Sequence, residues 1–301
     1  MTITMSKMIN SSLKQLGQRT PRISRNFSRL LLSNPNLLLG SIILIVVLLA
    51  AIFAPLLTRT EYTRLNPIER LQSPSAEHWF GTDKFGWDVF DRTLVGSRPS
   101  LLVGFSVTAI VVLFGLVIGT VSGYFRRADI FMMRAVDAVE AFPTIILALS
   151  LIAVLGASLR NVIIAISVAS VPGAVRLVRG LTLQIRETAY VDASKAAGAQ
   201  FYRILALHVV PNVVPLLVVH ATALLAGAIL TEASLSFLGL GTPEYIPTWG
   251  NAIASGRPFL RQAIWISLFP GLILSLTVLA FNLVGDGVRD VLDPKMMRSM
   301  L

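Results

Sequence analysis

The sequence predicts an all-α integral membrane protein with six transmembrane helices and with both termini in the cytoplasm. Apolar residues make up 54% of the chain and charged residues only 14%, which lies far outside the range of soluble domains. Uncharged runs of bilayer length recur along the sequence, and basic residues gather in alternate segments between them. In such a chain, we expect the net charge of +10 to face a membrane surface rather than nucleic acid.

Residues 1–36 form a basic tail without an acidic residue, which we expect to stay in the cytoplasm. The uncharged run Leu37 to Leu57 follows, and at 1.5 Å per residue it reaches about 31 Å, the thickness of a hydrocarbon core. A cleaved signal peptide is the rival interpretation, but its basic region and its apolar core would both be too long. We therefore expect a retained first helix over residues 37–57.

Residues 58–98 carry six basic and six acidic residues, and this balance suits an external loop. The string from His78 to Asp88 contains two tryptophans and two phenylalanines. Aromatic side chains favour the headgroup level, so the string predicts an interfacial helix or a lid.

Residues 99–286 are predicted to form the core of the membrane domain, with five further spans. These runs are Pro99 to Phe125, Ala141 to Leu159, Asn161 to Val175, Val209 to Thr231 and Gln262 to Gly285. The run from Asn161 is short, but Arg176 and Arg179 can snorkel and let its helix continue to Gly180. Residues 287–301 remain as a cytoplasmic tail. On this topology cytoplasmic segments hold 17 basic and 8 acidic residues and external segments 9 and 7, as expected for this orientation.

Two glycine patterns bear on how these spans pack. Gly115, Gly119 and Gly123 recur every four residues, which puts them on one helix face and predicts close contact with another helix. Near the end of the chain, the glycines at 285 and 287 are expected to stop the last helix. The neighbouring Asp286, Arg289 and Asp290 are expected to cross-link cytoplasmic helix ends.

Residues 187–212, here called the elbow, are a polar interruption that predicts two short helices with a bend between them. Alanines share one face of the first helix, and Gly198 stands where a helix ends in a left-handed residue. The second helix has a bulky face that we expect to insert into the protein, and Pro211 suits the entry of the next span. The alanine face comprises Ala189, Ala193, Ala196 and Ala197, and the bulky face comprises Phe201, Ile204, Leu205 and His208.

The elbow resembles the cytoplasmic loop of importer-type ABC transporter permeases. The matching residues are Asp192-Ala193-Ser194, Gly198 and His208-Val209-Val210-Pro211, with Asp192 and Ser194 where the family usually has Glu and Ala. The resemblance implies a coupling helix that lodges in a groove of a separate ATPase subunit. The residues implied for this coupling role are Ala189, Asp192, Ala193, Ser194, Ala197, Gly198 and Pro211.

Three further strings are similar to signatures of the peptide and nickel importer permeases. They are Gly81 to Asp88, with Trp87 where Arg is common, then Ser236 to Gly241 with Trp249-Gly250, and Phe281 to Pro294. The chain thus resembles the second permease subunit of a dipeptide, oligopeptide or nickel ABC importer. The resemblance implies a type I ABC importer permease fold in the bacterial cytoplasmic (inner) membrane. It also implies a sister permease, two ATPase subunits and an extracytoplasmic solute-binding protein as partners.

The chain lacks the sequence of a nucleotide-hydrolysing enzyme. A phosphate-binding loop needs glycine before its lysine, and none of the five lysines follows a glycine. We therefore expect no catalytic residue and no cofactor in this chain, with Mg-ATP used by partner subunits. The three histidines stand apart from other metal-ligating residues, and the chain has no cysteine, so no metal site is expected.

Glu232 is the one carboxylate deep in a predicted span. Such a group usually faces a cavity or a partner. One interpretation makes it a pathway or gate residue that senses the amino terminus of a peptide. The other, which we favour, makes it a structural carboxylate bonded to a neighbouring arginine or to backbone opened by the glycines that follow. Trp249-Gly250 is taken as a return loop at the membrane interface.

The main functional prediction is a peptide importer permease, with nickel or another small solute as the alternative substrate. An ATP-independent carrier or channel is a second class, and mitochondrial carriers share the length and the six spans. Their repeated Pro-x-acid-x-x-base motif is incomplete in the nearest string, Pro67 to Arg70. An assembly subunit that moves no solute is a third class.

Overall fold

The computed structural model describes residues 34–58 and 66–292, so most of the tail predicted at 1–36 and residues 293–301 lie outside it. Within the described residues all regular structure is helical, apart from an isolated bridge between Thr82 and Asp88. The main helices are α3 (Pro35–Leu57), α4 (Val89–Tyr124), α5 (Arg126–Glu140), α6 (Thr144–Leu155), α7 (Leu159–Arg186), α8 (Ala189–Ala196), α9 (Phe201–Ile204), α10 (Val210–Phe237), α11 (Trp249–Gly256) and α12 (Trp265–Leu292).

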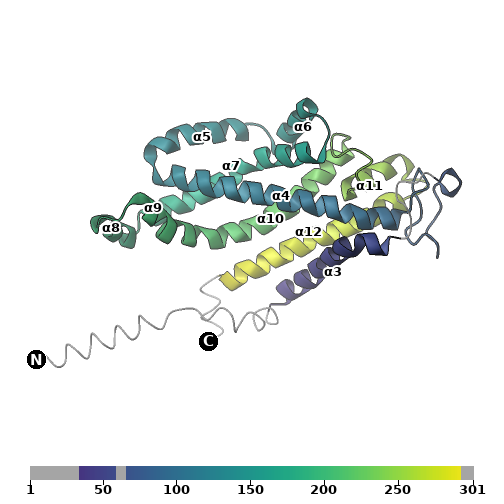
Figure 1. Cartoon of the computed structure of the whole chain (residues 1–301), viewed down its shortest axis with the longest axis horizontal. Helices are drawn as coiled ribbons and strands as arrows, with labels where there is room; N and C mark the ends of the chain where they lie inside the picture. Colours follow the sequence, from purple (N-terminus) through teal and green to yellow (C-terminus); the bar gives the residue numbers. More distant parts are fainter. Residues whose placement is uncertain (1–33, 59–65, 293–301) are drawn as a thin grey trace, which may run out of the picture.

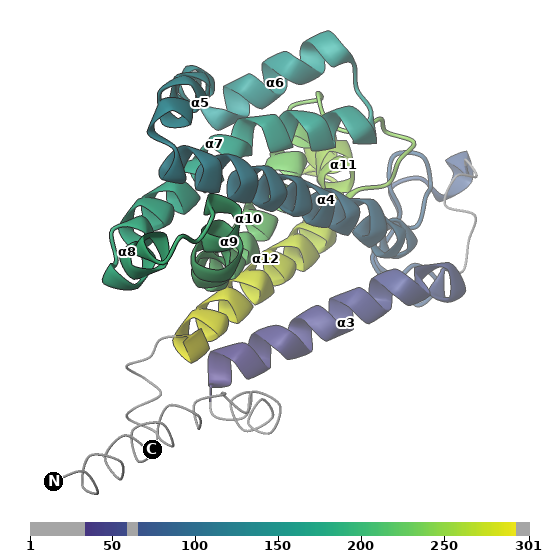
Figure 2. The ribbon, with the colours of Figure 1, turned by 60° about the vertical axis from the view of Figure 1, so that its left-hand side comes forward.

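The long helices α3, α4, α7, α10 and α12 lie side by side in one bundle (Figures 1 and 2). The short helices α8 and α9 project at one end of this bundle, here called the elbow end. Residues 66–88 and α11 lie at the opposite end, here called the loop end. Five helices of the described chain are long and apolar enough to cross a membrane, so the protein is a multi-pass membrane protein.

A sixth crossing is made by two helices rather than one. Helix α4 finishes at the elbow end and α7 begins at the loop end, so α5 and α6 together carry the chain between them (Figure 1). These two helices meet at an angle of 85°. The run predicted as a span over 141–159 forms only the second helix of this bent pair, so the predicted bounds of the span are wrong. Pro143 explains the break, because a proline disfavours helical backbone in the residue before it.

Helix α4 begins ten residues earlier than the predicted start at Pro99. Its cap is Asp88, whose side chain accepts hydrogen bonds from the backbone N–H groups of Phe90 and Asp91. A carboxylate at this position satisfies amide groups that have no partner within the helix. The helix that enters the predicted core at 99–286 therefore begins within the residues predicted as an external loop, 58–98.

The glycines of α4 allow its contact with α7. A Cβ atom at Gly115, Gly119 or Gly123 would lie 2.6 Å from the Cβ of Ala174, Val178 or Thr182, respectively, which is closer than real Cβ atoms come. Only glycine lets the two backbones approach to this distance. The prediction that this face packs against a helix is confirmed.

Helix α12 runs through Gly285 and Gly287, so the prediction that these glycines stop it is wrong. Each supports a close approach instead, Gly285 to Thr222 of α10 and Gly287 to Leu37 of α3. The expected cross-link between helix ends is confirmed for Asp290, whose Oδ2 accepts a hydrogen bond of 2.9 Å from Asn34 Nδ2.

A proline in α3 creates the polar contact between α3 and α4. Pro55 has no N–H, so the carbonyl of Ala51 has no partner within its helix. Arg98 of α4 donates to this carbonyl from Nε at 2.7 Å and to the carbonyl of Ile52 from Nη2 at 2.8 Å. An arginine predicted in an external loop therefore satisfies the backbone of a membrane helix.

We predict that Gly119→Ala destabilises the protein by about 1–3 kcal/mol, because the added methyl group forces α4 and α7 apart. The matched control is Gly173→Ala in α7, where an added Cβ would meet no atom within 4 Å. Thermal unfolding of the purified proteins in detergent measures both. Equal melting temperatures for the two variants would contradict the packing argument.

Candidate functional site

The elbow begins directly after α7 and places its alanines on the surface. Thr188 precedes α8, whose Val191 is fully buried and holds the helix against the bundle. The alanine face, Ala189, Ala193, Ala196 and Ala197, is exposed as predicted. Small side chains allow another protein surface to approach the backbone closely.

Gly198 ends α8 in the left-handed conformation that the sequence predicts, with φ +82°. Its N–H donates to the carbonyl of Lys195 at 2.9 Å, and the N–H of Ala199 donates to the carbonyl of Ser194 at 3.0 Å. These two bonds form a Schellman motif, which satisfies the last carbonyls of a helix. The bend between the two arms of the elbow is therefore fixed by hydrogen bonds.

The second arm of the elbow is the root of α10 rather than a separate helix. From Phe201 to Phe237 the chain forms one helical stretch of 37 residues, which includes a π turn at Leu205–Val209. Ile204 is buried and Leu205 packs against a buried cluster, but Phe201 is 53% exposed, so its predicted inward orientation is wrong. Pro211 lies in the first turn of α10, as predicted, although the helical stretch as a whole already begins at Phe201.

Ser194 and His208 join the two arms. Ser194 Oγ lies 3.2 Å from His208 Nε2, and the ring of Tyr190 lies 5.6 Å from the imidazole ring. An alanine at position 194 would have no hydroxyl group for this contact. The sequence pattern placed His208 on the bulky face and did not reveal its partner, which is fourteen residues away.

Glu232 lies near the end of α10 at the loop end, and its side chain is fully buried. Its Oε1 accepts a hydrogen bond of 2.8 Å from Ser236 Oγ, and its buried Oε2 has no hydrogen-bond partner among the described residues. No arginine of the described residues pairs with it, so the hydroxyl group of Ser236 takes the place of the arginine that was expected as its partner. The carboxylate is enclosed by the chain in this conformation.

The loop that follows closes over Glu232. Trp249, expected at the membrane interface, is fully buried at the start of α11, and its indole N–H donates to the carbonyl of Thr93 at 3.0 Å. Asn251 Nδ2 donates to the carbonyls of Thr242, Pro243 and Ile246. These bonds hold the loop between α10 and α11 as a packed cap on the bundle.

A buried ion pair organises residues 66–92. Asp83 and Arg92 are almost fully buried and 2.7 Å apart, and Asp83 Oδ1 also accepts the N–H groups of Phe85 and Trp87. The guanidinium group of Arg92 lies 4.5 Å from the ring centre of Trp87. Within residues 71–88 the chain forms no helix, so the predicted interfacial helix is wrong.

Comparison with known proteins identifies the family. Residues 111–298 match the family described as "Binding-protein-dependent transport system inner membrane component", and residues 24–74 match "N-terminal TM domain of oligopeptide transport permease C". The chain belongs to this permease family. Two relatives are the Dipeptide transport system permease protein DppC of Alkalihalophilus pseudofirmus and the Oligopeptide transport system permease protein OppC of Bacillus subtilis. The first is 46% identical, covering 86% of both chains, and the second is 39% identical, covering 88% of both.

Solved structures show the same fold for this permease. A chain from the structure titled "Inward facing conformations of the MetNI methionine ABC transporter" aligns with a TM-score of 0.57 at 21% identity. The alignment covers 67% of this chain and 97% of the other. The predicted fold class, that of a type I ABC importer permease, is confirmed.

The three histidines of the permease lie in three different settings. His78 Nδ1 lies 2.8 Å from Asp88 Oδ2, His208 contacts Ser194 in the elbow, and His220 lines a pocket between helices. Within residues 34–58 and 66–292, no group of three or more metal-ligating side chains forms.

We predict that Arg92→Ala destabilises the permease by about 3–5 kcal/mol, because it leaves the carboxylate of Asp83 buried without a cation. Lys84→Ala removes an exposed pair, in which Nζ lies 3.4 Å from Glu244 Oε1, and is expected to cost at most about 1 kcal/mol. Thermal unfolding in detergent measures both variants. A smaller loss for Arg92→Ala than for Lys84→Ala would show that the buried pair does not organise this loop.

Proposed function

We propose that this chain is a permease subunit of a bacterial ATP-driven importer of dipeptides or oligopeptides. The observation that carries the proposal is the elbow, an exposed alanine face on a helix whose bend and root are fixed by the rest of the chain. The peptide substrate is supported by relatives named for dipeptide and oligopeptide transport over most of their length. In this proposal the protein lies in the cytoplasmic membrane with the elbow and both termini on the cytoplasmic side.

The proposed complex contains a sister permease, two ATPase subunits and an extracytoplasmic binding protein. The two permeases form the pathway, each supplying half of it. This chain has no catalytic residue in the proposal, and Mg-ATP is bound and hydrolysed by the ATPase subunits. The elbow lodges in a groove of one ATPase through its alanine face.

The elbow and α10 form one continuous lever in this mechanism. The helical stretch Phe201–Phe237 spans about 55 Å at 1.5 Å per residue, which is longer than the hydrocarbon core of a bilayer. A displacement of the elbow by the closing ATPases reaches the loop end along this helix, where Glu232 and its hydroxyl partner Ser236 lie. Glu232 then acts as a structural part of the outer gate, which opens when the cap over it shifts.

The test of this function combines copurification with uptake. Cells that express the chain with the transport genes beside its own should take up labelled dipeptides, and the chain should copurify with ATPase subunits. Ala196→Trp should abolish copurification, because an indole on the alanine face prevents close docking. The control is Ala153→Trp, an exposed position on α6. Uptake of nickel without peptide would assign the alternative substrate, and a chain that transports without an ATPase would be a carrier.

Gly198 tests the lever separately from docking. Gly198→Val should leave ATP hydrolysis in place and stop coupled uptake, because a β-branched residue does not adopt φ +82° and the bend is lost. An added Cβ meets no atom within 4 Å there, so the effect comes from the backbone alone. Gly198→Asn should retain most uptake, since asparagine tolerates the left-handed conformation. Normal uptake in the valine variant would count against the lever.

A further inference from the structure

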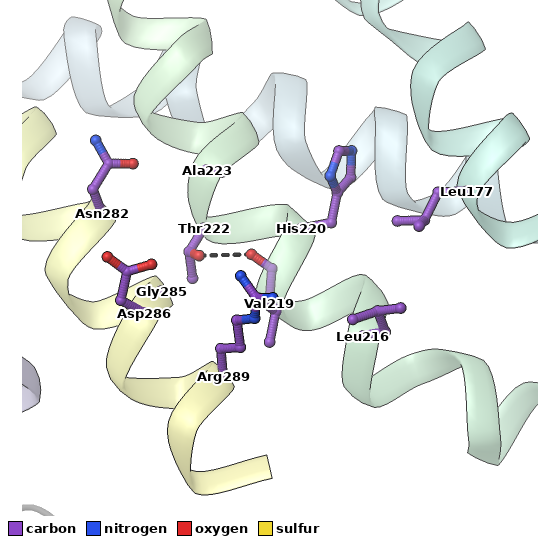
Figure 3. Close-up of a pocket in the computed structure, with 10 residues that line it drawn as sticks. All are labelled: Leu177, Leu216, Val219, His220, Thr222, Ala223, Asn282, Gly285, Asp286 and Arg289. Carbon is purple, nitrogen blue, oxygen red and sulfur yellow. Dashed lines mark hydrogen bonds between the residues drawn. The ribbon is translucent and has the colours of Figure 1, made fainter. Parts of the chain in front are cut away.

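A pocket of about 320 Å³, lined by apolar side chains and by a few polar ones, lies between α10 and α12 in the half of the bundle nearer the elbow (Figure 3). Its lining residues are Leu177, Leu216, Val219, His220, Thr222, Ala223, Asn282, Gly285, Asp286 and Arg289. Figure 3 shows Asp286 and Arg289 projecting from α12 beside α10, with Asn282 farther along the same helix. The glycine at 285 keeps the two helices close at the floor of the pocket.

The exposed face of α12 changes from apolar to polar along its length. Toward the loop end it presents leucines, at 268, 272 and 276. Toward the elbow end it presents Asn282, Asp286 and Arg289, which are spaced four and three residues apart and therefore share one face. Asn282 lies about 15 Å from the end of its helix by the helical rise. The polar stretch therefore begins well inside the span.

These three polar side chains have no partner within the part of the chain that the structure describes. Asn282, Asp286 and Arg289 make no hydrogen bond or ion pair there, whereas Asp290 on the same helix is bonded to Asn34. Ionisable groups inside a membrane usually face a water-filled cavity or a partner rather than lipid. The part of the pocket that these side chains line is therefore better suited to water and a polar ligand than to acyl chains.

The opposite charges select the class of ligand. An arginine binds a carboxylate through two parallel hydrogen bonds, and an aspartate accepts hydrogen bonds from an ammonium group. Side chains three residues apart on a helix have Cβ atoms about 5–6 Å apart. Two extended residues of a peptide span about 7 Å at most, so both of its charged ends lie within reach of two side chains on one helix face. Small-molecule sites usually measure about 300–1,000 Å³, and a pocket at the lower end suits a short ligand.

We infer that this pocket is a transient site for a short peptide with free termini, on the elbow side of the pathway. Arg289 binds the terminal carboxylate, Asp286 binds the terminal ammonium group, and Asn282 bonds the peptide group between them. The site deepens the proposed peptide import and rests on it for its biological role. The ligand expected in this pocket is a zwitterionic peptide of about two residues.

The natural absence of cysteine from this chain allows a direct test in the assembled transporter. Ala223→Cys places a single thiol of this chain in the pocket, and Val46→Cys, at an exposed apolar position of α3, is the lipid-facing control. Inverted membrane vesicles are treated with a charged, membrane-impermeant maleimide, with and without dialanine. N-acetyl-dialanine amide, which lacks both charges, is the ligand control. Val219→Cys, also on the lining, replaces Ala223→Cys if that variant fails to assemble.

We expect Ala223→Cys to react and Val46→Cys not to react. Dialanine at ten times its half-protecting concentration should slow labelling roughly tenfold, and the blocked peptide should not slow it. Arg289→Gln and Asp286→Asn should each remove the protection, while Arg289→Lys should keep part of it. Lack of labelling at Ala223→Cys and at Val219→Cys, equal protection by both peptides, or protection that follows anionic lipid content instead of peptide would each overturn the site.

Uptake of dialanine by the same wild-type complex separates the two proposals. Uptake of dialanine without protection of the pocket cysteine from labelling overturns the pocket site and leaves peptide import standing. Protection without uptake of any peptide supports the site and overturns peptide import as the function. The absence of both overturns both.

Discussion

The close approach of α4 and α7 is the contact on which the rest of the permease depends. Glycines at 115, 119 and 123 let the two backbones touch along three turns. At the end of this seam, Arg186 of α7 donates to the carbonyls of Gly123 and Tyr124, which end α4, at 3.2 Å each. The elbow begins directly after Arg186, so its position follows from the α4–α7 contact. In a bilayer, where lipid is as apolar as the side chains, such backbone proximity supplies the attraction that water supplies in soluble proteins.

Polar side chains in this bundle lie where a free backbone carbonyl or a charged group needs a hydrogen-bond partner. Arg98 bonds the carbonyl that Pro55 leaves free, Asp83 pairs with Arg92, and Asp129 accepts two hydrogen bonds from Arg179 between α5 and α7. A bilayer offers no water to satisfy such groups, so each must be bonded within the protein.

Sequence patterns predicted the features that depend on one residue type in one local geometry. The glycine face of α4, the left-handed Gly198 and the exposed alanine face follow from helical periodicity and from the backbone freedom of glycine. These properties are local, so no tertiary information was needed. The predicted fold class is confirmed by the family match over residues 111–298 and by the solved structures.

The features that sequence analysis missed depend on contacts between distant residues. The hydropathy of the sequence predicted that α4 starts at Pro99. The cap at Asp88 and the ion pair between Arg92 and Asp83 stabilise the polar turns before Pro99, so these turns are part of the helix. Gly285 and Gly287 looked like a helix end, yet their role is to admit Thr222 and Leu37 from other helices. A glycine that ends a helix and one that admits a neighbour have the same sequence signal, and only the packing distinguishes them.

The contacts of α10 determine how it can move. Val209 and Val213 are buried near the elbow, Thr222 meets the glycine of α12 at mid-length, and Glu232 is bonded within the cap at the other end. A helix that is packed at three positions along its length cannot bend at one of them without breaking contacts. Packed contacts change between discrete arrangements rather than continuously. Displacement of the elbow therefore moves α10 together with α12, to which α3 is joined through the hydrogen bond between Asn34 and Asp290. In the proposed mechanism, the pocket between α10 and α12 therefore moves together with both helices.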